Sequence, residues 1–125
     1  MEFTDVGTFT EESCDYPDFA LSVGRGVAEG TFPLGIVICG SGIGVSISAN
    51  KVRGVRAALC TNEYMAEMSR RHNDANVLAL GARITGDDLA LAIVRRWLGT
   101  SFEGGRHARR VGKISEAEEK WSCGA

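Results

Sequence analysis

The stretch Gly35-Ile36-Val37-Ile38-Cys39-Gly40-Ser41-Gly42-Ile43-Gly44-Val45-Ser46 decides the fold of this 125-residue chain. Its first half is a short apolar run rich in β-branched residues, which is typical of a strand buried on both faces of a parallel sheet. Its second half holds three glycines in five residues and leads into a segment, residues 45–52, that can continue as a helix. A strand, a glycine turn and a helix in this order direct backbone N–H groups and the positive end of a helix at an anion.

Two side chains in this stretch can carry chemistry. The thiol of Cys39 ends the predicted strand, and the hydroxyl of Ser41 lies inside the turn, so a nucleophile or a base would sit beside an anion site. The plainer interpretation is a tight turn that needs glycine, with a buried cysteine acting as a small apolar residue. The spacing fits neither a Walker loop, because no Lys-Ser or Lys-Thr pair follows, nor a dinucleotide fingerprint.

The composition bounds the class of protein. Hydrophobic residues make up 44% and charged residues 24% of the chain, as in an ordinary soluble globular protein, and the length fits one domain over residues 1–125. A net charge of −2 argues against general nucleic-acid binding, and no apolar run is long enough to span a membrane. The four cysteines show no zinc or redox spacing, which favours reduced thiols and a cytoplasmic location.

Strand-like and helix-like segments alternate along the chain, which predicts an α/β fold with a doubly wound parallel sheet. Cys39, Cys60 and the loop after Leu80 should then meet at the carboxyl edge of the sheet, where such folds bind ligands. The expected strands cover residues 1–6, 35–39, 55–60 and 76–80. The expected helices cover residues 15–30, 45–52, 63–71, a segment after Thr85, and 106–120.

Helix signals support several of these boundaries. Asp15 and Asn62 are residues that cap helices, and Thr85 is expected to cap the helix that follows it. Tyr64 and Met68 lie four residues apart and are expected to form the inner pair of the helix over 63–71.

Basic residues suggest a phosphate site near the last helix. Arg106 and Arg110 lie four residues apart, so they share one helical face behind the Gly104-Gly105 hinge and could hold a phosphate. The alternative is a solvated basic face, to which Arg109 and Lys113 would also belong. His72, in a polar turn, and Tyr16, at a helix start, are more often a surface histidine and a packing aromatic than ligand contacts.

Several motifs together resemble the B-type ribose-5-phosphate isomerases, a family that includes the galactose-6-phosphate isomerase subunits. The similarity runs from about residue 2 to residue 120, and Asp15-Tyr16-Pro17 fits it as well. The motifs that carry it are Ile38 to Gly44, Ser48-Ala49-Asn50-Lys51, Arg71-His72-Asn73-Asp74-Ala75-Asn76-Val77 and Phe102-Glu103-Gly104-Gly105-Arg106-His107.

The resemblance implies interconversion of aldose and ketose phosphates through a cis-enediolate, without a metal or an organic cofactor. Cys39 would be the base that moves a proton between C2 and C1, and Ser41 would assist proton exchange between the sugar oxygens. The amides of the loop would stabilise the enediolate oxygen as an oxyanion hole. The substrate-binding residues of that loop would be Gly40, Gly42, Ile43 and Gly44.

The same resemblance assigns roles to residues outside the loop. His72 would open the furanose ring with Asn73 beside it, and Tyr16 would contact the sugar. Arg106 and Arg110 would bind the phosphate. Family members form dimers or dimers of dimers with sites near the subunit interface, which implies a homodimer or homotetramer.

One departure from the family concerns the beginning of the chain. Family members carry a strand, a Cys-Asp-His turn and a long helix before the stretch that matches residues 2–6, so the first βα unit is missing here. That strand would lie centrally, and its loss is expected to leave backbone groups unpaired and Val37 and its neighbours uncovered. Three explanations are open: the start of the chain is mis-assigned, the chain is a fragment, or the sheet closes in another way. The chain alone is expected to be aggregation-prone or poorly active.

The sequence therefore predicts a Rossmann-like, three-layer α/β/α isomerase that converts ribose 5-phosphate to ribulose 5-phosphate. A tetrose- or hexose-phosphate isomerase is an alternative, because the depth of the pocket sets the length of the sugar. A catalytically inactive sugar-phosphate-binding or assembly subunit is the alternative from a different class. Neither nucleic acid nor a membrane is an expected partner.

Overall fold

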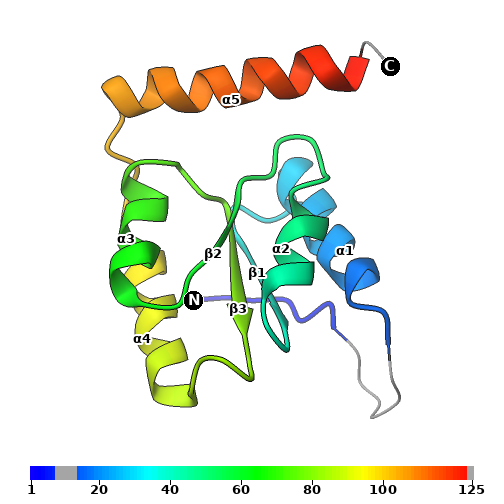
Figure 1. Ribbon diagram of the computed structural model, residues 1–125, viewed down its shortest axis with the longest axis vertical. Helices are drawn as coiled ribbons and strands as arrows, with labels where there is room; N and C mark the ends of the chain where they lie inside the picture. Colours follow the sequence, from blue (N-terminus) through cyan, green and yellow to red (C-terminus); the bar gives the residue numbers. More distant parts are fainter. Residues whose placement is uncertain (8–13, 124–125) are drawn as a thin grey trace.

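A three-stranded parallel sheet lies between two layers of helices in the computed structural model, which describes residues 1–7 and 14–123 (Figure 1). The strand order is β1-β3-β2. The strands are β1 (Gly35–Cys39), β2 (Ala57–Leu59) and β3 (Val77–Gly81). The helices are α1 (Tyr16–Ala28), α2 (Ile43–Ala49), α3 (Glu63–Arg71), α4 (Asp87–Leu98) and α5 (Arg106–Cys123). This arrangement confirms the predicted Rossmann-like α/β fold.

The central strand β3 fixes the direction of the whole sheet. All of its residues are buried, and it pairs in parallel with both neighbours, Cys39 of β1 lying opposite Gly81 and Leu59 of β2 opposite Ala79. The carboxyl ends of the strands therefore meet at one edge of the sheet, and their amino ends meet at the other.

Alternating side chains divide the core between the two faces of the sheet. On one face α1 and α2 pack over Val37 and Ala79, and on the other α3 and α4 pack over Leu78. Trp97 and Ile93 of α4 are fully buried in the second cluster, where the burial of Ile93 contributes roughly 1.5–3 kcal/mol.

Two local expectations are wrong. Tyr64 of α3 is 69% exposed, and the buried residues of that helix are Ala66 and Ser69, whose small side chains let α3 approach α4 closely. Thr85 does not cap α4, since Gly86 occupies the cap position and the N–H of Thr85 donates to the carbonyl of Gly81 in the preceding turn.

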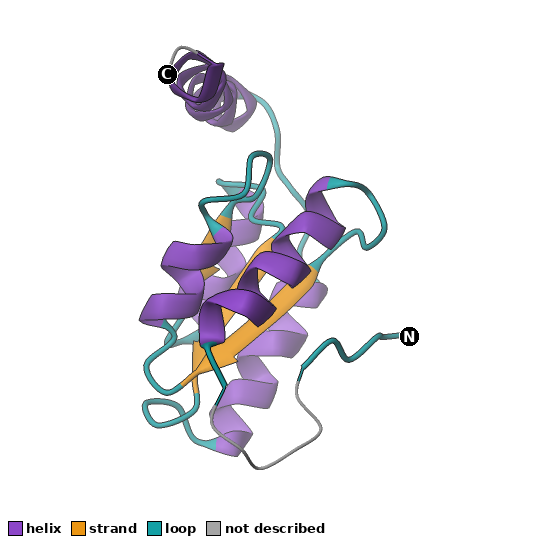
Figure 2. Cartoon of the chain, turned by 90° about the vertical axis from the view of Figure 1, so that its right-hand side faces the viewer, coloured by secondary structure: helices purple, strands orange, loops and turns teal. Residues whose placement is uncertain are grey.

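The N-terminal segment is a further correction, because residues 1–6 form no strand. Met1 and Phe3 are exposed, and Figure 2 shows the segment apart from the sheet. A strand needs a neighbouring strand to pair its backbone, and residues 1–6 pair with none of the three described strands. The loop predicted after it falls largely on residues 8–13, outside the described residues.

The outer edge of β1 has no strand partner among residues 1–7 and 14–123. Val37 is nevertheless buried under α1 and α2, so the expectation that it would be uncovered is wrong. Its neighbours Ile36 and Ile38 point to the other face, which α4 does not reach at this edge, and both are exposed.

Helix α5 extends beyond the amino edge of the sheet and is largely exposed (Figures 1 and 2). Near its end the carboxylate of Glu118 accepts a hydrogen bond from the N–H of Gly54 at 2.8 Å, and Glu119 pairs with Arg53. None of the helices in the described part of the chain has the length and apolar character needed to cross a membrane.

Candidate functional site

The glycine turn after β1 places the Cys39 thiol at the amino end of α2. Gly42 adopts a left-handed conformation with φ of 80°, which an L side chain rarely adopts, and this turn starts the helix directly. The N–H of Gly42 donates to Cys39 Sγ at 3.2 Å, and the N–H of Ile43 donates to Ser41 Oγ at 3.2 Å. The predicted strand, turn and helix are thus all present.

The other glycines of the turn allow close approach. A Cβ on Gly44 would collide with the ring of Tyr16, so the glycine lets that aromatic ring lie against the loop from the first residue of α1. A Cβ on Gly42 would lie 2.8 Å from the carbonyl carbon of Leu80. The turn is therefore packed directly against the carboxyl end of β3.

This environment changes the acidity of Cys39. Burial raises the pKa of the thiol, but hydrogen bonding from backbone N–H groups lowers it by more, and the net pKa lies below the ordinary value of a cysteine. The N–H groups responsible belong to Val45, Gly42, Ser41 and Gly44. A thiolate is the form of cysteine that accepts protons, and the loop favours this form of Cys39.

A cavity of about 600 Å³ opens in front of the thiol. This volume is ample for a sugar phosphate. Six of the predicted site residues line it, namely Tyr16, Cys39, Gly40, Ser41, Ile43 and Gly44, and Ile47, Arg83 and Ile84 complete the wall.

Arg83 is a site residue that the sequence prediction missed. It follows β3, its N–H donates to the carbonyl of Gly40 at 2.9 Å, and its side chain lies over Gly40. A guanidinium in the cavity can bind phosphate or stabilise a developing negative charge. The sequence did contain a signal for it, because the loop after Leu80 was expected at the carboxyl edge and Arg83 is a cation in that loop.

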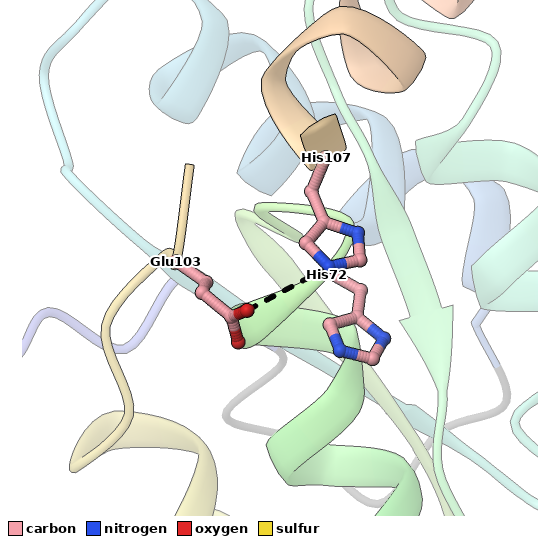
Figure 3. A group of neighbouring side chains, drawn as sticks. All are labelled: His72, Glu103 and His107. Atoms are coloured by element: carbon pink, nitrogen blue, oxygen red, sulfur yellow. Dashed lines mark ion pairs between the residues drawn. The ribbon is translucent and has the colours of Figure 1, made fainter. Parts of the chain in front are cut away.

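A second group of residues, which contains the predicted site residue His72, gathers at the opposite edge of the sheet. His72 ends α3 before β3 begins, and its ring stacks on that of His107 from the first turn of α5, with centroids 4.1 Å apart and planes 10° apart (Figure 3). Glu103 lies beside both rings, 3.8 Å from His107 Nε2 through its Oε1. Its other oxygen pairs with Arg71 at 3.2 Å.

His107 is the second residue that sequence reasoning missed, although it ends a quoted motif and lies between Arg106 and Arg110 in the sequence. Burial lowers the pKa of its imidazole, the electrostatic effects of the neighbouring His72, Arg106 and Arg110 lower it further, and Glu103 opposes them. The imidazole is therefore neutral near pH 7.

The two groups do not meet within one chain. The five residues of β3 separate the two edges by about 13 Å of strand. Asn73 follows His72 and is exposed, and the exposed Arg106 and Arg110 lie on the first turns of α5, beyond the amino edge (Figure 1). One chain thus presents half of the predicted site at each edge.

Comparison with known proteins places this arrangement in a family. The family described as Ribose/Galactose Isomerase matches residues 1–114. Ribose-5-phosphate isomerase B of Escherichia coli (strain K12) is 49% identical over 120 residues, which are 96% of this chain and 80% of that protein. The structure of Clostridium thermocellum Ribose-5-Phosphate Isomerase B aligns with a TM-score of 0.93 and 63% identity, covering 94% of this chain and 80% of that one.

A third relative carries a different substrate in its name. D-erythrulose-4-phosphate isomerase of Pectobacterium atrosepticum is 45% identical over 111 residues, which are 89% of this chain and 73% of that protein. The match to the family, the identity to its members and the shared fold lead to one conclusion. The chain belongs to the ribose/galactose isomerase family and is an isomerase.

Proposed function

We propose that this isomerase interconverts ribose 5-phosphate and ribulose 5-phosphate through a cis-enediolate, with the Cys39 thiolate as the base. The observation that carries the proposal is a thiol of lowered pKa facing a cavity of about 600 Å³. Cys39 takes the proton from C2 of the open-chain aldose and returns it to C1, so the carbonyl moves from C1 to C2. The reaction is redox-neutral and needs no electron carrier.

The loop amides complete the chemistry at the carboxyl edge. Backbone N–H groups between Gly40 and Gly44 stabilise the enediolate oxygen, where negative charge develops in the transition state. Ser41 exchanges a proton between the two sugar oxygens. Tyr16 and Arg83, which line the same cavity, contact the sugar and its charged end.

The remaining groups come from a second copy of the chain. His72, which opens the furanose ring, and the phosphate ligands Arg106 and Arg110 lie at the amino edge, about 13 Å of strand from Cys39. A symmetric dimer can bring the amino edge of one copy to the carboxyl edge of the other and form two equal sites. The active form is therefore a homodimer or a homotetramer, with Asn73 beside His72 in each site.

An isomerase that acts on a shorter or a longer sugar phosphate is the alternative within the same class. A tetrose phosphate fits the same chemistry, in keeping with the relative named for D-erythrulose 4-phosphate, and a hexose phosphate fits a deeper pocket. Steady-state rates on four-, five- and six-carbon sugar phosphates decide between these substrates. A chain that binds sugar phosphate without turning it over would be a binding or assembly subunit.

Co-expression of two impaired variants, assayed at a substrate concentration well below KM, where loss of a phosphate ligand lowers the rate, tests the shared site. Cys39→Ala and Arg106→Ala damage opposite edges, so a mixed dimer keeps one intact site and a one-to-one mixture should recover about a quarter of the activity. Cys39→Ala with Arg83→Ala is the matched control, because both changes lie at the same edge and no intact site forms. Equal recovery in both mixtures, or in neither, would contradict the two-copy site.

The proposed setting is the cytoplasm. Cys14, Cys39 and Cys60 are free thiols, in keeping with a reducing compartment. A small phosphorylated sugar is the proposed partner, and neither nucleic acid nor a membrane is part of the proposal.

A further inference from the structure

Three metal-ligating side chains from separate parts of the chain meet at the amino edge of the sheet. His72 ends α3, Glu103 lies in the loop before α5, and His107 lies in the first turn of α5 (Figure 3). One possible ligand atom from each residue can be chosen so that all lie within 4.8 Å of one another. The fold, rather than a local sequence motif, builds this group.

The histidine at the centre of the group has an unused nitrogen. His107 is only 5% exposed, and its Nε2 has no hydrogen-bond partner among the residues that the structure describes. Glu103 Oε1, at 3.8 Å, is too distant for a hydrogen bond. Buried polar atoms are nearly always partnered, so a nitrogen left open beside a carboxylate points to a missing ligand.

Arg71 fixes the orientation of the Glu103 carboxylate. Its Oε2 is held by Arg71 at 3.2 Å, and the backbone N–H of Glu103 donates to the carbonyl of Arg71 at 3.0 Å. Its Oε1 is thereby turned toward the imidazoles. Residues that orient a ligand in this way are a regular part of protein metal sites.

We propose that His72, Glu103 and His107 form a binding site for a divalent transition metal such as Zn²⁺, and that the bound ion inhibits the isomerase by occupying His72. Two imidazoles and one carboxylate are a set of ligands that suits Zn²⁺, with the fourth position left to water or to an anion. The inhibitory half rests on the role of His72 in the proposed function, whereas the binding half does not.

Two features limit the strength of the site. The stacked rings must tilt for both nitrogens to reach one ion, and His72, which is only partly buried, provides that movement. The guanidinium groups of Arg71, Arg106 and Arg110 lie nearby and repel a cation. The ion is therefore exchangeable, and its occupancy follows the free metal concentration.

Titration of the metal-free 125-residue chain with Co²⁺ tests binding without any assay of activity. We expect one equivalent to produce the visible absorption of cobalt with nitrogen and oxygen ligands, without the strong near-ultraviolet band of a sulfur ligand. Glu103→Gln, at a half-exposed position, should weaken binding about 10–100-fold. Glu116→Gln, an exposed carboxylate of the same helix α5, is the matched control and should bind as the wild type does.

Two further variants separate this site from the thiols. His107→Ala should lose the visible band, and Cys39→Ser should retain it. A sulfur band that disappears in Cys39→Ser, no binding by the wild type, or equal binding by wild type and Glu103→Gln would each overturn the site.

Inhibition is measured separately. The Co²⁺ concentration that halves the isomerase rate should rise about 10–100-fold in Glu103→Gln relative to the wild type, in parallel with the loss of binding. The same inhibition in both proteins would overturn the inhibitory half, because the ion would then act elsewhere.

Discussion

The two edges of the sheet carry different kinds of site. At the carboxyl edge, the thiol of Cys39 and the amides around it come from one short stretch, and the backbone alone fixes their geometry. At the amino edge, His72, Glu103 and His107 come from three segments, and Arg106 and Arg110 project from a helix that is largely exposed.

In the proposed function, this difference separates proton transfer from substrate binding. A base must keep its pKa and position, and a rigid turn packed against β3 provides both. Phosphate binding needs charge and reach, which long side chains on α5 provide. Neither edge alone provides all the groups that the proposed reaction needs. Substitutions at the carboxyl edge should therefore lower the rate, and substitutions at the amino edge should weaken substrate binding.

Removal of the thiol should have the largest effect. Cys39→Ala is expected to lower the isomerase rate by about 10²–10⁴-fold while sugar phosphate still binds, because no carboxylate or imidazole lines the cavity among the described residues. The rate and the binding constant are measured on the same preparation. Cys14→Ala, at an exposed position, is the control and should keep full activity, and near-full turnover by Cys39→Ala would exclude it as the base.

Distortion of the turn should have the next largest effect. Gly42→Ala forces a methyl group toward the carbonyl carbon of Leu80, at 2.8 Å, and onto a backbone with φ of 80°. The displaced N–H groups should reduce the rate by about 10²–10³-fold, the scale of a lost oxyanion donor. Gly112→Ala, where an added methyl group meets nothing within 4 Å, is the matched control and should leave the rate unchanged.

The same variant tests the acidity of Cys39. Alkylation of the thiol by iodoacetamide, followed against pH, should show a midpoint below that of an ordinary cysteine in the wild type, because the backbone N–H groups lower the pKa of Cys39. In Gly42→Ala the N–H groups no longer stabilise the thiolate, so the midpoint should rise. An unchanged midpoint would mean that these N–H groups do not set the pKa.

The sequence predicted the carboxyl edge better than the amino edge for a physical reason. The glycines, Cys39 and the flanking strand and helix are local, so the strand over residues 35–39 was placed correctly from pattern alone, and the helix expected over residues 45–52 is present as α2, Ile43–Ala49. The stacking of His72 on His107 depends on where α5 begins after a loop, which no periodicity encodes. The strand expected over residues 1–6 is absent, because a strand forms only where its backbone pairs with a neighbouring strand, and local residue preference does not determine that pairing.

Loss of a phosphate ligand should have a smaller effect, on binding. Arg106→Ala or Arg110→Ala is expected to weaken sugar-phosphate binding by about 1.5–3 kcal/mol, the contribution of a hydrogen bond to a charged group. Arg109→Ala and Lys113→Ala, on the neighbouring face of α5, are the matched controls and should change binding far less. Calorimetric titration measures all four, and equal losses would indicate a diffuse basic surface.

The smallest expected effect on stability lies at the open edge of β1. Ile38 is 58% exposed and lies opposite Leu80 in the register, on the face that α4 does not cover at this edge. Ile38→Lys should change the free energy of unfolding by no more than about 0.5 kcal/mol, whereas Ile93→Ala, in the core of α4, should cost about 2–5 kcal/mol. Urea unfolding measures both variants.

The same substitution should reduce aggregation. An unpaired strand edge with exposed apolar side chains invites pairing with other chains, and a lysine at such an edge opposes it. Light scattering of Ile38→Lys should therefore show less self-association than the wild type at equal concentration. If the substitution instead unfolds the protein, or abolishes activity while Cys39 keeps its alkylation midpoint, another chain segment covers Ile38 in the active assembly and the edge is an interface rather than a free surface.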